Sequence, residues 1–143
     1  MSYFSNCMYF STNLLARHLN NIANEAFKDL DFTPTQGFTL IAIGQLDKHY
    51  PSEIACELEM KPSTITRFLD KLEECGYIVR TYKGRQAKVD LTERGYEIIE
   101  KVNECWKKID DEITDTFGET ICKETTKNIV IANQIYTDKN CKK

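Results

Sequence analysis

The sequence lacks the features that mark secreted, membrane-spanning and zinc-binding proteins. No charged segment followed by an apolar run opens the chain, so we expect no secretory signal. The longest apolar-rich run, FTLIAIGQL at 38–46, is far shorter than the roughly 20 residues needed to span a bilayer. The six cysteines form no C-x-x-C pair and no cluster with His18 or His49 at zinc-finger spacing. We therefore expect a reduced, cytoplasmic protein with no metal and no membrane partner. Four of its thiols are expected to pack in the core: Cys56, Cys75, Cys105 and Cys122.

Motifs that would indicate an enzyme are also missing. No nucleophile and base stand at a recognisable spacing, and no glycine-rich phosphate loop or metal-ligand set is present. We therefore expect neither catalysis nor a cofactor.

Positive charge is scarce overall but concentrated in one region. Lys and Arg total 19 against 22 Asp and Glu, a net charge of -3, which excludes a basic coat over the whole protein. Residues 61–88 nevertheless carry a net +4, which leaves -7 for the rest of the chain. A contiguous basic region of this kind can bind a polyanion locally.

Helical periodicity and a single hairpin account for most of the chain. Apolar residues recur at steps of three and four in the helical segments, and the period changes to two after Gly76. Thr33-Pro34-Thr35-Gln36 is a capping box with proline at the first helical position. The predicted elements are helices within 3–30, from Pro34, after Pro51 and from Pro62, strands at 78–82 and 87–91, a helix from Thr92 to Gly118, and a last helix at about 119–137.

This order predicts a mainly α fold with a small β-hairpin, in one domain covering residues 1–143. The compact middle, 34–91, has the order of a winged helix-turn-helix. The long helices of 1–30 and 92–137 have little core to cover them in a chain of this size. We expect them to pack against the same helices of a second copy as a two-fold dimer.

The helix over 62–76 has one apolar and one polar face. Ile65, Phe68, Leu69 and Leu72 fall at i, i+3, i+4 and i+7, and predict the core face. In a helix-turn-helix the second helix enters the major groove with its first residues at the base edges. Those residues are Ser63, Thr64, Thr66 and Arg67, of which Arg67 suits guanine best. One turn further on, Lys71 is better placed for a phosphate.

The hairpin carries three cations at or near its glycine turn, Lys83, Arg85 and Lys88. A cationic turn is a poor core element but suits a minor groove or a phosphate backbone. The residues therefore favour a DNA-binding protein. The alternative is a winged helix used only for protein interaction, and that surface would be expected to carry exposed aromatic residues instead.

The runs PSTITRFLDKLEECGYIVR at 62–80, LTERG at 91–95 and FTPTQ at 32–36 resemble the MarR family of bacterial transcriptional regulators. The resemblance extends over about 10–137. It implies a homodimer that binds a pseudo-palindromic operator, usually as a repressor. Release would follow from a small phenolic or lipophilic effector or from an oxidant.

The resemblance also assigns individual residues. It marks Ser63, Thr64, Thr66 and Arg67 as the recognition-helix readers, Arg85 as the wing arginine, and Asp70 as an acidic group that pairs with a wing cation. The wing tip departs from the family pattern, because it is shorter and lacks an aspartate. Cys7 lies near the position of the reactive thiol in the peroxide-sensing branch and is a candidate redox sensor. No cation adjoins it in sequence to lower its pKa, which favours a packed thiol instead.

Overall fold

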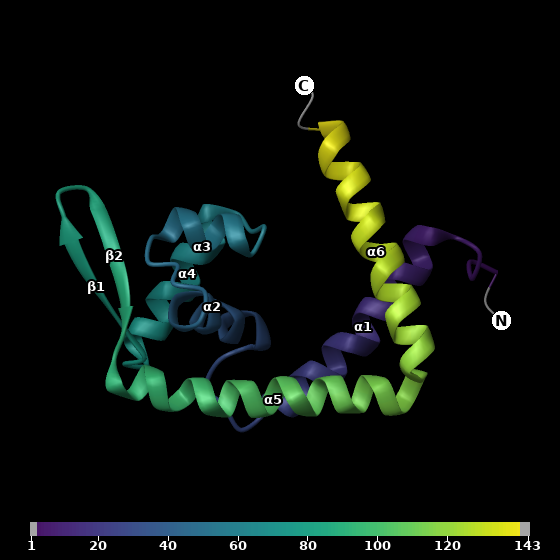
Figure 1. Ribbon diagram of the computed structural model, residues 1–143, viewed down its shortest axis with the longest axis horizontal. Helices are drawn as coiled ribbons and strands as arrows, with labels where there is room; N and C mark the ends of the chain where they lie inside the picture. The colour runs from purple at the N-terminus through teal and green to yellow at the C-terminus, as the bar shows by residue number, and fades with distance from the viewer. Residues whose placement is uncertain (1–2, 141–143) are drawn as a thin grey trace.

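A computed structural model describes residues 3–140 and shows eight elements along the chain (Figure 1). Helix α5 forms a long beam. The hairpin and three helices lie at one end of it, and the two terminal helices lie at the other (Figure 1). This confirms the predicted mainly α fold with a winged hairpin. The elements are α1 (Met8–Ala26), α2 (Pro34–Gly44), α3 (Pro51–Glu57), α4 (Pro62–Glu74), β1 (Ile78–Lys83), β2 (Gln86–Leu91), α5 (Glu93–Phe117) and α6 (Glu119–Asn140).

Side-chain caps set the start of two helices. Thr33 and Gln36 exchange the reciprocal hydrogen bonds of a capping box at the start of α2, as predicted. At the start of α5, Thr92 Oγ1 accepts from Gly95 N at 3.0 Å and donates to Gly76 O at 2.7 Å. The cap of α5 is therefore also a tertiary contact, and it ties the beam to the turn that precedes the hairpin.

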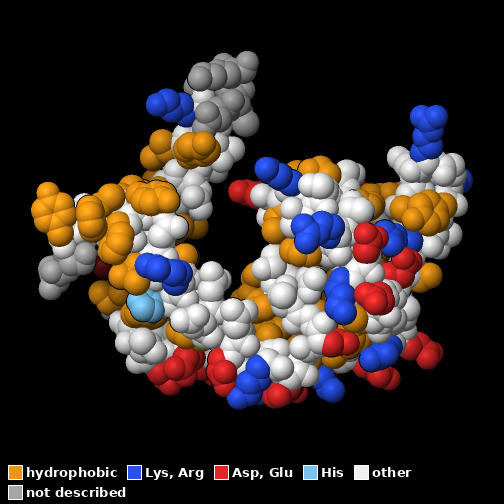
Figure 2. All heavy atoms as spheres, turned by 180° about the vertical axis from the view of Figure 1, so that it is seen from behind, with side chains coloured by type: hydrophobic (Ala, Val, Ile, Leu, Met, Phe, Trp, Pro, Cys, Tyr) orange, Lys and Arg blue, Asp and Glu red, His pale blue; other side chains and the backbone are white. Residues whose placement is uncertain are grey.

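Both terminal helices leave apolar side chains exposed. Within the described residues, neither α1 nor α6 contains a buried residue. Apolar side chains gather on their surfaces at one end of the molecule (Figure 2). The large exposed ones at this end include Met8, Tyr9, Leu14, Ile121, Ile129, Val130, Ile131, Ile135 and Tyr136. No described helix is both long and apolar enough to cross a bilayer.

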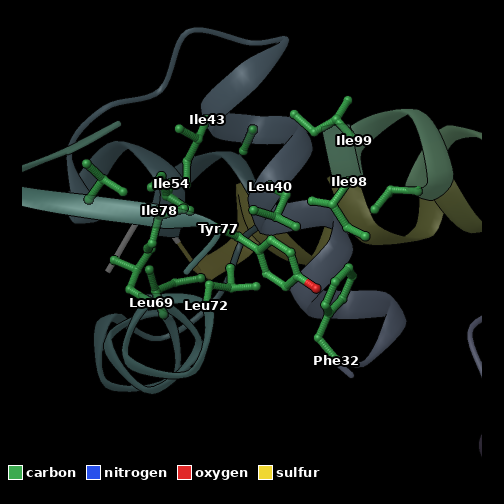
Figure 3. Close-up of a cluster of buried hydrophobic side chains, with 14 of the residues drawn as sticks. Phe32, Leu40, Ile43, Ile54, Leu69, Leu72, Tyr77, Ile78, Ile98 and Ile99 are labelled. Atoms are coloured by element: carbon green, nitrogen blue, oxygen red, sulfur yellow. The ribbon is translucent and has the colours of Figure 1, made fainter. Parts of the chain in front are cut away.

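The core lies where α2, α3, α4 and the hairpin meet α5 (Figure 3). Ile65, Leu69 and Leu72 are fully buried and Phe68 is half-buried, so the predicted apolar face of α4 is confirmed. All four belong to this cluster or pack against it, and Figure 3 shows Leu69 and Leu72 among its side chains. The core thus fixes which face of α4 is turned inward and which is left to solvent.

The hairpin is antiparallel and ends in a two-residue loop. Pairing extends to Lys83 opposite Gln86, one pair beyond the predicted strand ends, so only Gly84 and Arg85 form the loop. Gly84 has φ +64°, the conformation that a type II′ turn requires at its first central position. Glycine adopts it without the penalty of a Cβ.

The cysteines are less uniformly packed than predicted. Cys105 is buried and its Sγ donates to Ala26 O at 3.1 Å, while Cys75 and Cys122 are half-buried. Cys56 is exposed on α3, so its assignment to the core was wrong. Its helix buries Ile54 and Ala55 instead, and the next residue turns away from the core. All five described cysteines are free thiols.

Candidate nucleic-acid interface

The outward face of α4 is polar and starts at an uncapped helix end. Pro62 occupies the first turn, and Lys61 at the N-cap makes no side-chain hydrogen bond to the helix. Ser63, Thr66 and Arg67 are exposed and Thr64 is half-buried. The structure therefore brings the four predicted readers together on one side of the helix.

Thr66 and Arg67 differ in which hydrogen-bonding groups of their side chains remain available. Thr66 Oγ1 donates to Pro62 O at 3.0 Å, so its hydroxyl is left mainly as an acceptor, with its methyl group beside it. The Arg67 side chain makes no hydrogen bond or ion pair with any other described residue. Its five N–H donors are available, and bidentate recognition of guanine or phosphate uses two of them.

Lys71 lies on a flank of α4 instead of on its outward face. It is half-buried and borders a shallow hollow of about 550 Å³ that is also lined by Asp31, from the segment between α1 and α2, and by Gln36 in the first turn of α2. Its Nζ is 4.0 Å from Glu74 Oε2, which is the limit of an ion pair. Its side chain is thus separate in position from the four readers.

Arg80 on β1 joins the wing to α4. Its Nη2 lies 2.8 Å from Asp70 Oδ1 and 2.6 Å from Glu73 Oε2, and its Nε donates to Glu73 Oε2 at 3.0 Å. Arg80 N also donates to Glu73 Oε1 at 3.1 Å. These hydrogen bonds from Arg80 lower the pKa of Glu73 below its usual range. Asp70 therefore does contact a wing cation, but a strand residue supplies it and not the tip.

Sequence reasoning missed Arg80 and Glu73 as a pair. Arg80 was counted as a basic residue, and it closes the run GYIVR, so the signal was present in the motif. The tight turn at Gly76, with φ +78°, folds β1 back along α4 and brings the two side chains together. The resulting cluster of Asp70, Glu73 and Arg80 is called the wing clamp below.

The cations of the hairpin fall into two groups. Lys83 and Arg85 are exposed at the tip and form no ion pair with the described residues. Lys88 sits in the strand opposite Thr81, and its Nζ is 2.9 Å from Asp90 Oδ1. That contact raises the pKa of Lys88 and offsets part of its field. The positive charge of the wing is therefore concentrated at the loop.

Cys7 is exposed at the N-cap of α1, away from the wing and α4. Its backbone N donates to Phe4 O at 2.9 Å. Exposure removes one objection to a redox role, since an oxidant can reach the thiol. Redox sensing at Cys7 stays a prediction.

The class of winged helix-turn-helix proteins is defined by three helices and a two-stranded wing, with a polar, exposed face on the second helix of the helix-turn-helix, which is α4 here. Residues 32–83 match the model of the MarR family. The chain is 32% identical over 107 residues to the HTH-type transcriptional regulator SarZ of Staphylococcus saprophyticus, covering 72% of this chain and 73% of that protein. It is 25% identical over 141 residues to the HTH-type transcriptional regulator BilQ of Clostridioides difficile, covering 94% and 95%.

The fold is shared with solved structures as well. The crystal structure of the S. aureus MepR–DNA complex superposes with a TM-score of 0.77 at 18% identity, covering 95% of this chain and 99% of that one. The chain belongs to the MarR family, as the sequence motifs indicated. It is a DNA-binding transcriptional regulator of that family and not an enzyme.

Proposed function

We propose that the protein binds a pseudo-palindromic operator as a homodimer and represses transcription from the adjacent promoter. Helix α4 enters the major groove and the wing tip contacts the minor groove or the backbone. One observation carries this proposal. The wing clamp holds the polar face of α4 beside the hairpin, and within residues 3–140 neither Arg67 nor the cations at the hairpin tip have an ion-pair partner.

The proposed contacts divide by chemistry. Arg67 reads a base edge, because its free guanidinium fits the two acceptors of guanine. Thr66 accepts from an exocyclic amine or packs its methyl on a thymine, since its proton is held by Pro62 O. The remaining contacts go to phosphates and position the protein. They are assigned to Lys71, Lys83, Arg85 and Lys88, while the hydroxyls of Ser63 and Thr64 can bind either a base edge or a phosphate.

The homodimer is supported by the uncovered apolar faces of α1 and α6. An apolar groove of about 220 Å³ runs between α1, α5 and α6, bordered by Leu19, Phe117 and Ile129 among others. A contiguous patch of exposed apolar side chains, like the one on α1 and α6, marks an interaction site. In such a dimer, binding two successive half-sites would require the two copies of α4 to lie about 34–36 Å apart, one turn of DNA. The MepR–DNA complex, which has the same fold, shows that this architecture can engage a duplex.

Selection of bound duplexes from a random pool, at low and at moderate salt, tests the proposal. The expected result is an enriched inverted repeat whose half-sites are about one helical turn apart, and a dimeric mass by light scattering. In vitro transcription from a promoter that overlaps the enriched site should fall when the protein is added. Binding without any enriched sequence would favour the protein-interaction module instead. A rise in transcription would refute repression while leaving operator binding intact.

Release by an effector is part of the same proposal. A small phenolic or lipophilic ligand, or oxidation of Cys7, would act on the α1–α6 end and change the distance between the two copies of α4. The dimer end and the wing are joined by the single beam of α5, so a tilt at one end moves the other (Figure 1).

A further inference from the structure

His49 lies where the loop between α2 and α3 meets the wing strand β2. Its backbone O accepts from Val89 N at 2.7 Å. Its ring reaches the same strand, with Nδ1 2.9 Å from Val89 O and 3.1 Å from Asp90 Oδ1. On the other side of the ring, Nε2 lies 2.8 Å from Asp47 Oδ1. One imidazole thus contacts the wing strand through Nδ1 and its own loop through Nε2.

Every oxygen that faces these two nitrogens is an acceptor. A neutral imidazole has one donor and one acceptor nitrogen, so it would set a lone pair against an oxygen at Asp47 or at Val89 and Asp90. Only the imidazolium donates on both sides. The geometry therefore selects the protonated ring.

Other groups around the ring reinforce this preference. Asp47 adopts a left-handed backbone conformation with φ +54°, and its carboxylate lies against the ring. His49 N donates to Glu53 Oε2 at 3.2 Å, which fixes the backbone of the loop. The titratable groups that interact with His49 from the loop, α3 and β2 are Asp47, Glu53, Lys88 and Asp90, and Tyr50 follows it in the chain. Lys88 alone among them opposes protonation, and its charge is paired with Asp90.

We propose that protonated His49 is a latch that holds the wing against the helix-turn-helix, and that loss of this proton frees the wing and weakens DNA binding. The ring is a positioning group and touches no DNA in this scheme. The DNA part rests on the proposed function, whereas the latch itself is a property of the free protein. The signal it senses is proton concentration, independently of any effector at the dimer end.

The direction of the pH effect follows from the hydrogen bonds. Those to Val89 O and to Asp47 raise the pKa of His49 above its ordinary value of 6.5. A raised value in the folded state means that the latch is complete below about pH 6.5 and is lost as pH rises through the folded pKa. Both wing order and operator affinity should therefore fall from neutral to alkaline pH.

The first experiment uses the free full-length protein. Imidazole NMR signals give the pKa of His49 directly, because the chain has two histidines and a His18→Gln variant identifies the other. Backbone order parameters at Gly84 then report wing motion, with α4 amides as an internal reference. We expect titration above 6.5 and a loss of order at Gly84 over the same pH range. Titration at or below 6.5, or an unchanged wing across the transition, overturns the proposal.

The second experiment measures affinity for the selected operator from about pH 6 to about pH 9 at fixed salt. Wild type should lose about three- to tenfold more affinity than His49→Gln, the scale of one partly screened charge-assisted hydrogen bond. His18→Gln should follow wild type. Asp47→Asn keeps the histidine and should shift its titration to lower pH, which provides a second variant if His49→Gln folds poorly.

The two experiments separate the possible failures. If the protein binds no operator at any pH, the proposed function fails and the NMR titration still decides the latch. If affinity falls with pH while the wing stays ordered, the cause is the lost positive charge itself and the latch is refuted. An equal pH profile in wild type and His49→Gln also refutes it.

Discussion

Replacing Arg80 with methionine removes the cation of the wing clamp and keeps most of its aliphatic stem. The Arg80 side chain is 15% exposed and bonds to both Asp70 and Glu73. One hydrogen bond to a charged group contributes about 1.5–3 kcal/mol net. Asp70 and Glu73 are 57% and 38% exposed, so water replaces much of what they lose. We therefore expect the free energy of unfolding to fall by about 1–2 kcal/mol, well short of the sum of the separate bonds.

Urea unfolding at neutral and acidic pH measures this change. The pKa of Glu73 is lowered by its hydrogen bonds to Arg80, so the clamp stabilises above the ordinary value of 4.5 and is lost as pH falls through the folded value. The gap between wild type and Arg80→Met should therefore close on acidification. Arg85→Met is the matched control, because Arg85 is an exposed wing cation with no partner among the described residues. It should change stability by less than about 0.5 kcal/mol. Equal stability of the two variants, or a gap that does not vary with pH, would refute the clamp.

Three further predictions concern separate parts of the molecule. Arg67→Ala should weaken specific operator binding by about 1–3 kcal/mol and relax the preference at one base position, while Lys71→Ala should weaken all duplexes alike in the same titrations. An unchanged preference in Arg67→Ala would show that another residue reads the base. Peroxide should abolish operator binding by wild type but not by Cys7→Ser, and equal loss in both would exclude the sensor. Gly95→Ala should cost about 1–3 kcal/mol in urea unfolding, because its Cβ would lie 2.1 Å from Tyr77 O; a neutral effect would mean that this backbone contact relaxes freely.

The contact that forbids a side chain at Gly95 explains why the LTERG motif ends in glycine. Gly95 sits in the first turn of α5, directly against the backbone carbonyl of Tyr77 at the base of the wing. Thr92 caps the same turn and also binds Gly76 O. Together they hold the start of the beam against the turn from which β1 leaves. A short motif thus fixes the root of the wing.

Local features of the fold were predictable because their causes lie within a few residues. The capping box of Thr33 and the buried face of α4 follow from contacts between neighbours one turn apart. The glycine of the hairpin follows from the turn it must make. The family motifs likewise are read within one continuous run, so membership in the MarR family could be inferred before any coordinates were known.

Two contacts of the wing depended on the tertiary structure. Arg80 reaches Asp70 and Glu73 only because the turn at Gly76 lays β1 along α4. His49 meets Val89 from 40 positions away, and nothing in its own neighbourhood indicates that contact. The sequence by itself thus determined the elements, their inner faces and the family. The packing decided which charges are paired and which, like Arg67, have no ion-pair partner among residues 3–140, because pairing between distant side chains depends on where the folded backbone places them.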